Sequence, residues 1–520
     1  MPAASAPCVK CCAAPAQALV RVRERLCAPC LHGQLQAKFR AAVRLGGVLR
    51  PGDHVVAAFS GGPCSAMLLR LLEGMRGEAG ARPERSKTPF RLTILHVDEG
   101  AAAGLDAHAA AAAAAAVEAA VAPYLASPAV QFLHVNLEDA FAEVDNAGGE
   151  DNEGSDIDRG RTTTPWRCGD EERRQRRAAL AALLAAIPDT TGREDLLEHL
   201  RSRLLLATAA RIGAGKVARG DSATRLATRA VAAAAKGRGY ALAGDVHLVD
   251  ARRSPAAPLF FFPLRELGSR ELALAAHFER LLLTPSAHEL AAAAAAGGGS
   301  GGGGLRRARQ EQRSINALAE RFVAGLQAHN PGTVANILGT AAKLRPFAWN
   351  NPPELACTLG DKARRNRQQH LPGTRRAAST ADSAAAAASE AEVEPHSVLC
   401  PLCSAPLAQD ELPAVALQAC GGSGSELHPA AEAVAGGVAA LLPFCLSCRS
   451  QILGDQPSSS PAAAAAGTGG QEVADLLPPS VRQEARRLAA AAGCSAEAAG
   501  PGRPLPPEQL RQQIAEFLID

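Results

Sequence analysis

Four cysteine pairs supply the clearest candidate chemistry in this sequence of 520 residues. Two of them lie near the amino terminus, Cys8-x-x-Cys11 and Cys27-x-x-Cys30, with fifteen residues between the pairs. Two short knuckles at this separation can bring four thiolates to one tetrahedral metal ion, which is the zinc-ribbon pattern. Cys12 is an alternative ligand to Cys11. The spacing predicts a structural zinc site, and a chance set of cysteines is the alternative.

The second group of cysteines lies toward the carboxyl terminus. It consists of Cys400-x-x-Cys403 and Cys445-x-x-Cys448, with Cys420 in the long intervening loop. In a reducing compartment, spaced cysteine pairs serve as metal ligands more often than as disulfides. We therefore predict a second zinc site here. Free buried thiols and an iron–sulfur cluster remain alternatives.

A glycine turn offers a different chemistry. Residues 53–59 form a short apolar run typical of a buried strand, and Ser60-Gly61-Gly62-x-x-Ser65 leads from it into a helical pattern. Glycines at such a turn let the backbone approach a phosphate closely, and the helix start presents unpaired N–H groups. Ser60, Gly61, Gly62 and Ser65 are thus candidate nucleotide-binding residues, although any tight strand-to-helix connection can use such glycines.

The elements around this turn alternate between strand and helix. Apolar runs typical of strands follow at 91–97, 130–135, 216–218 and 260–263, and helical patterns cover 194–212 and 222–236. Alternation at this spacing favours a parallel sheet. We predict an α/β fold with a Rossmann-like parallel sheet, helices on both faces, small cysteine-rich ends and long low-complexity insertions.

Composition divides the chain further. Hydrophobic residues make up 47% of it, but many are Ala, which contributes little burial, and the sequence has 48 Gly and 35 Pro. The expected segments are a zinc-ribbon-like head (1–40), an α/β domain (41–290) with insertions at 101–120 and 144–175, a flexible linker (291–304), a helical extension (305–376), a linker (377–395), a cysteine-pair segment (396–450), a linker (451–479) and a helical tail (480–520). The Ala-rich insertion at 101–120 is expected to be disordered or weakly helical.

The charge is uneven although the net charge is only +3. Residues 201–240 contain nine Lys and Arg against the single acid Asp221. Such a run is either a solvated helix face or a nucleic-acid contact surface. No run of eighteen large apolar residues predicts a membrane span, and the first residues lack a secretory pattern, so a cytoplasmic location without membrane contact is expected.

Several of these stretches together resemble a known family. Ser-Gly-Gly-x-x-Ser after a strand resembles the PP-loop ATP pyrophosphatases, which adenylate a nucleobase oxygen before replacing it. Within that superfamily the sequence is similar to the cytoplasmic tRNA 2-thiolation protein 2 family in 58–65, 96–99, 220–227, 237–239, 263–266 and 314–322, together with the paired cysteines at both ends. The order of these blocks is more specific than any one of them.

The resemblance implies a function in tRNA modification. Members act with the tRNA 2-thiolation protein 1 subunit, as a heterodimer, to place sulfur on the wobble uridine of tRNAs for Lys, Glu and Gln, giving 5-methoxycarbonylmethyl-2-thiouridine. The sulfur comes from a thiocarboxylated ubiquitin-related modifier, and ATP is consumed. On this basis the basic run supplies candidate tRNA-binding residues: Arg211, Lys216, Arg219, Arg225, Arg229, Lys236 and Arg238.

The sequence departs from active PP-loop thiolases at the positions that perform the chemistry. Pro63 and Cys64 stand where those enzymes have Lys and Asp, and Thr224, Arg225 and Thr228 stand where three acids are expected. Thr and Arg cannot hold magnesium against ATP phosphates. We therefore expect no catalytic residue in this chain, and binding of ATP and Mg²⁺ is doubtful.

Two other interpretations remain open. One is a complete ATP-dependent tRNA sulfurtransferase. The other is a zinc-dependent protein-interaction scaffold.

Overall fold

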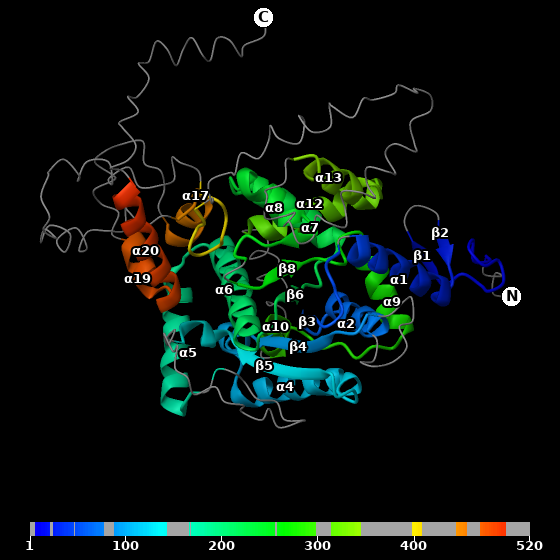
Figure 1. Ribbon diagram of the computed structural model, residues 1–520, viewed down its shortest axis with the longest axis horizontal. Coiled ribbons are helices and arrows are strands. Elements are labelled where there is room, and N and C mark those ends of the chain that lie inside the picture. Colours follow the sequence, from blue (N-terminus) through cyan, green and yellow to red (C-terminus); the bar gives the residue numbers. More distant parts are fainter. Residues whose placement is uncertain are drawn as a thin grey trace, which may run out of the picture.

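A six-stranded sheet lies at the centre of the computed structural model (Figure 1). Its spatial order is β5-β4-β3-β6-β8-β7, and the strands are β3 (His54–Ala58), β4 (Arg91–Asp98), β5 (Val130–Asn136), β6 (Lys216–Ala218), β7 (Val249–Asp250) and β8 (Leu259–Phe261). Neighbouring strands run parallel except for β7, which pairs antiparallel with β8 at one edge. The predicted parallel α/β fold is confirmed.

The structure describes residues 6–20, 24–45, 47–76, 88–142, 166, 168–254, 257–297, 314–344, 398–407, 444–454 and 469–495. The expected linker at 377–395 lies outside these residues. So do most of the expected insertion at 144–175, the second half of the extension at 305–376 and the end of the tail at 480–520.

Helices cover both faces of the sheet, as its strands require. Alternate residues of a strand point to opposite faces, so Val55 and Ala57 pack on one side and Val56 on the other. The first face is covered by α1 (Ala28–Leu45), α2 (Pro63–Met75) and α9 (Ser269–Phe278). The second is covered by α6 (Thr190–Arg211) and α7 (Ala223–Ala235).

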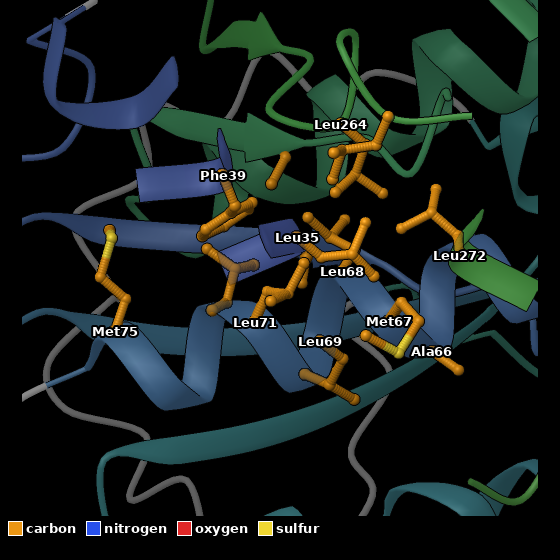
Figure 2. Close-up of a cluster of buried hydrophobic side chains, with 14 of the residues drawn as sticks. Leu35, Phe39, Ala66, Met67, Leu68, Leu69, Leu71, Met75, Leu264 and Leu272 are labelled. Carbon is orange, nitrogen blue, oxygen red and sulfur yellow. The ribbon is translucent and has the colours of Figure 1, made fainter. Parts of the chain in front are cut away.

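The first face contains the largest apolar cluster of the described residues. Leu68 and Leu71 of α2 lie beside Leu35 of α1 in Figure 2, and Phe39 of α1 belongs to the same cluster; all four side chains are buried. Burying side chains of this size contributes about 1.5–3 kcal/mol each. This packing fixes α2 against the sheet and thereby fixes the glycine turn from which α2 starts.

The stretch 101–120 differs from the expectation of a disordered or weakly helical insertion. It contains α3 (Gly100–Ala103) and most of α4 (Ala107–Val121). The Asp106 side chain caps α4 by accepting a hydrogen bond from the Ala109 N–H at 2.7 Å, and Ala is the best helix former. Val117 and Val121 then bury the helix against the sheet. Capping and two valines thus give an Ala-rich run a place in the core.

The remaining elements surround this centre. An amino-terminal hairpin of β1 (Ala18–Val20) and β2 (Glu24–Leu26) precedes α1. The others are α5 (Asp170–Ala186), α8 (Leu242–Val246), α10 (Ala287–Gly297), α12 (Ile315–His329), α13 (Thr333–Ala341), α17 (Leu446–Cys448), α19 (Gly469–Leu476) and α20 (Pro479–Ser495), with short helical turns η1 (Ala122–Tyr124), η2 (Leu137–Phe141), η3 (Gly239–Ala241) and η8 (Arg449–Leu453). Helix α10 extends into the expected linker at 291–304, and α19 lies within the expected linker at 451–479.

The carboxyl-terminal segments pack onto the α/β domain. In Figure 1, α19 lies beside α5 and α17 lies near the upper end of α6. Residues 398–407 and 444–454, which carry the second cysteine group, share one buried apolar cluster with α5, α6 and α19. These segments are therefore part of the main body of the protein.

Candidate functional site

The glycine turn is held by its own hydroxyl groups. The Ser65 Oγ donates to the Gly62 carbonyl at 2.9 Å and accepts from the Ser60 N–H at 3.2 Å. Gly61 has φ +80°, a conformation that L side chains rarely adopt. A Cβ on Gly61 would also lie 1.7 Å from the Thr284 Oγ1. The turn therefore requires glycine at this position, for conformation and for close packing.

A second loop lies against the glycine turn because β3 and β6 pair in parallel. Gly220 follows β6, and a Cβ there would lie 3.2 Å from the Ser65 nitrogen. Ser222 then caps α7 by accepting from the Arg225 N–H at 3.3 Å. The two strand-to-helix turns singled out in the sequence thus meet beyond the carboxyl ends of adjacent strands, where open α/β sheets bind ligands.

A cavity of about 660 Å³ adjoins these turns. Its lining includes Cys64 of the glycine turn and Thr224, Arg225 and Thr228 of α7. It also includes Cys403 of the second cysteine group. The cavity brings together positions that the sequence separates by more than three hundred residues.

Buried ion pairs occupy much of the space around the cavity. Arg219 contacts Asp221 at 2.9 Å and Glu198 at 2.6 Å, and Arg229 contacts Asp221 at 3.2 Å. Arg201 pairs with both Glu198 and Glu99. A buried charge is tolerated only when it is paired in this way. We call Glu198, Asp221, Arg201, Arg219 and Arg229 the charge network.

The network shifts the pKa values of its carboxyl groups. Burial alone raises the pKa of Asp221, but the guanidinium groups of Arg219 and Arg229 outweigh burial and hold that pKa below its usual value. Glu198 behaves in the same way, and its pKa lies well below the ordinary value. Both carboxylates are therefore charged at neutral pH, and each is satisfied by arginines of this chain.

Most of the candidate tRNA-binding residues are engaged inside the protein. Besides Arg219 and Arg229, Lys216 contacts Asp53 at 2.5 Å and Lys236 contacts Asp195 at 2.7 Å. Arg238 contacts Asp245 at 3.4 Å. A basic side chain that is already paired has less charge to offer a phosphate.

Two of the candidates are exposed. The Arg225 side chain is 67% exposed and lies 3.8 Å from Asp221. Arg211 is exposed, and its guanidinium lies 4.3 Å from the centre of the Trp166 ring. Arg225 alone of these two lines the cavity.

The amino-terminal cysteines converge as predicted. One ligand atom from each of Cys8, Cys11, Cys27 and Cys30 lies within 4.8 Å of the others, and the sulfurs of Cys11 and Cys27 are 3.7 Å apart. Four sulfurs at about 2.3 Å from a tetrahedral ion would be about 3.8 Å apart. Hydrogen bonds from the backbone near Cys11 lower the pKa of Cys8 to about 6, which favours the thiolate that binds a metal. This group fits a metal ion.

The carboxyl-terminal cysteines form a second group of the same kind. The sulfurs of Cys400, Cys403, Cys445 and Cys448 also lie within 4.8 Å of one another, and Cys403 and Cys445 are 3.5 Å apart. The long loop between the pairs therefore does not prevent convergence. Each of the two groups can hold one metal ion with four thiolates.

Comparison with known proteins finds similarity to one family. A family model described as cytoplasmic tRNA 2-thiolation protein 2 matches residues 314–450. The Arabidopsis thaliana protein of that name is 30% identical over 334 residues, which cover 64% of this chain and 61% of the relative. The chain is similar to the cytoplasmic tRNA 2-thiolation protein 2 family over these residues.

Other relatives of the family match to a similar extent. The Homo sapiens cytoplasmic tRNA 2-thiolation protein 2 is 28% identical, over 66% of this chain and 68% of the relative. The alignments with the Arabidopsis and rice relatives span somewhat less than two thirds of those proteins. A solved tRNA thiolase from Methanococcus maripaludis, which carries a 4Fe–4S cluster, aligns with 66% of this chain at 14% identity and a TM-score of 0.41.

The residues at the glycine turn do not fit Mg²⁺-bound ATP. Cys64, Thr224, Arg225 and Thr228 offer a thiol, two hydroxyls and a guanidinium where a magnesium site needs carboxylate oxygens. Asp221, in the loop that abuts the turn, is already paired with arginines. Four of the five departures from active PP-loop thiolases noted in the sequence, all except Pro63, thus line one cavity.

Sequence reasoning missed several residues of this site. Glu198 lies on α6, and nothing in its surroundings in the sequence indicates that three arginines converge on it. Asp221 did carry a signal, because it is the single acid within the basic run. A lone acid among arginines is a candidate for their buried partner.

We expect Asp221→Asn to destabilise the protein by about 3 kcal/mol at pH 7, because Arg219 and Arg229 are then left to share Glu198 as their counter-charge. The depressed pKa means that the contribution of Asp221 is present above its unfolded pKa, about 3.9, and is lost as the pH falls through the lower folded value. The difference in the free energy of unfolding between the variant and the natural protein should therefore become smaller below about pH 4. Urea unfolding of both proteins at pH 7 and at lower pH measures this difference.

Glu171→Gln is the matched control, because Glu171 pairs with Arg174 on the surface. Glu171→Gln should lower the free energy of unfolding by less than about 1 kcal/mol. Equal costs for the two variants at pH 7 would contradict the structural role of the charge network.

Proposed function

We propose that this chain is a non-catalytic subunit of the cytoplasmic machinery that thiolates the wobble uridine of tRNA. Its family relatives are named cytoplasmic tRNA 2-thiolation proteins. The observation that carries the non-catalytic role is the cavity beside the glycine turn, where Thr224, Arg225 and Thr228 replace the carboxylates that would hold magnesium. Among the described residues, these three positions at the cavity offer no carboxylate for magnesium.

The reaction partner supplies what this chain lacks. In this proposal a tRNA 2-thiolation protein 1 subunit binds ATP, adenylates the C2 oxygen of the wobble uridine and completes the sulfur transfer in tRNAs for Lys, Glu and Gln. A thiocarboxylated ubiquitin-related modifier delivers the sulfur. This chain contributes binding surface for tRNA and for that subunit, and two structural zinc ions, one in each four-cysteine group.

Two features bear on where the chain acts. No helix among the described residues is long and apolar enough to cross a membrane. The relatives carry the word cytoplasmic in their names, and we propose the same location for this chain. Clustered cysteines suit metal binding in such a reducing compartment.

The test of the proposal is a thiolation reaction with purified components. The chain alone, given tRNA, ATP and a thiocarboxylated sulfur donor, should form no 2-thiouridine, whereas the mixture with the partner subunit should form it. Mass spectrometry of digested tRNA detects the product. Turnover by the chain alone would favour a complete sulfurtransferase, and full turnover by the partner alone would favour a scaffold with no part in the reaction.

For tRNA binding we favour Arg225, which is exposed at the cavity, over the paired members of the basic run. Arg225→Glu should weaken tRNA binding and reduce the slope of log affinity against log salt by about one, because one phosphate contact is lost. Binding is measured by fluorescence anisotropy over a range of salt concentrations.

Arg91→Glu is the charge-matched control. Arg91 is exposed and is the first residue of β4. It therefore lies at the amino ends of the parallel strands, whereas the cavity lies beyond their carboxyl ends. Equal effects of the two reversals would contradict a contact at Arg225. Tight binding that does not depend on salt would contradict the phosphate-contact proposal as a whole.

A further inference from the structure

The segment Gly237-Arg238-Gly239, which follows α7, packs against the carboxyl-terminal cysteine group. Gly237 has φ +75°, and a Cβ placed on it would lie 3.9 Å from a methyl group of Leu446, between Cys445 and Cys448. Ala241 belongs to the same buried cluster as Cys400, Cys445 and Cys448. Arg238 and Cys403 both line the cavity.

Arg238 is buried with too little negative charge from carboxylates. Its side chain is 10% exposed, and it contacts the Asp245 carboxylate at 3.4 Å. Asp245 is closer to Arg252, at 2.8 Å, and Arg252 also contacts Asp250 at 2.7 Å. Arg203 and Arg253 share Glu484, so four guanidinium groups in this region face three carboxylates. A buried guanidinium without sufficient counter-charge is costly. The nearby cysteine sulfurs are a further source of negative charge.

Other arginines of the α/β domain hold the same cysteine segment. Arg203 of α6 donates to the carbonyl of Pro401. Arg252 donates to the Ser404 carbonyl at 3.0 Å, and the Arg253 Nε donates to the Ser404 Oγ at 2.6 Å. Residues 400–404 are therefore fixed to the domain by three arginine hydrogen bonds.

A glycine on α6 admits the second half of the cysteine segment. A Cβ on Gly192 would lie 1.9 Å from the carbonyl oxygen of Gln451, which follows Cys448 in η8. Backbone cannot approach this closely to any other residue type. The segments that carry both cysteine pairs thus pack directly against the α/β domain.

The charge on the cysteine group depends on its occupant. Four thiolates around one divalent ion carry a net charge of about −2. The metal-bound centre would supply the negative charge that Arg238 lacks.

We propose that Arg238 is the buried counter-cation of a metal–thiolate centre formed by Cys400, Cys403, Cys445 and Cys448, and that metal binding there locks the cysteine segment in place as a wall of the cavity. Arg238 is then a positioning residue and not a tRNA contact. This inference is independent of the tRNA function, since it concerns only the charge and packing of this chain.

The experiment measures zinc release from the full chain to a chromogenic chelator. The natural protein should hold two zinc ions per chain, and Cys27→Ser and Cys448→Ser each remove one, which assigns the two release phases. Arg238→Met should speed release from the carboxyl-terminal centre about tenfold or more, as loss of groups around metal ligands generally does. Release from the amino-terminal centre should not change.

Two variants control for charge and location. Arg238→Lys keeps the positive charge and should restore part of the slow release. Arg225→Met removes an exposed arginine from the same cavity and should leave both phases unchanged. Unchanged release from Arg238→Met would overturn the proposal.

Hydrogen exchange of the cysteine variants tests whether the metal holds the cysteine segment in place. This test remains possible if Arg238→Met fails to fold. Cys448→Ser should increase exchange in 398–407, 444–454 and α8, and Cys27→Ser should leave these segments protected. Equal protection from hydrogen exchange in the two cysteine variants would contradict the proposal that the metal holds the cysteine segment in place.

Discussion

Asp221 pairs with Arg219 and Arg229 beyond the carboxyl ends of β3 and β6. The rest of the structure around the cavity depends on this pairing of buried charges. Asp221 is 4% exposed and receives two arginines from its own region of the chain. Burying such groups is tolerable only if every charge is matched, which requires α6 and α7 to keep a fixed spacing. The geometry of the cavity follows from that requirement.

The same pairing limits what the cavity can do. In an enzyme that activates a nucleobase with ATP, carboxylates beside the glycine turn must be available for magnesium. Here Asp221 is neutralised by arginines, while Arg225 and two threonines occupy the neighbouring positions. The parallel sheet and its two strand-to-helix turns are present, with paired charge around them. Such a domain is suited to act beside an active partner, as the proposed function requires.

Sequence reasoning succeeded where the determinant was local. Short apolar runs predicted the strands, and pairs of cysteines predicted the two sulfur groups, because three-residue spacing by itself places two ligands together. It could not identify partners that are distant in the sequence. The basic run at 201–240 resembles an RNA-binding surface, yet Lys216 pairs with Asp53, 163 residues away, and Lys236 with Asp195. The Ala-rich stretch at 101–120 was underestimated because its cap, Asp106, and its two buried valines stand out only once the sheet is in place.

We propose that the cavity beside the glycine turn, which is lined by paired charge, does not serve as a site for magnesium-bound ATP. Isothermal titration of ATP with Mg²⁺ into the purified chain tests it most directly, with the active partner subunit titrated in parallel. The account predicts no saturable, Mg²⁺-dependent binding to this chain at millimolar ATP, and clear binding to the partner. Saturable binding to this chain that is lost on Gly61→Ala or on removal of Mg²⁺ would contradict it.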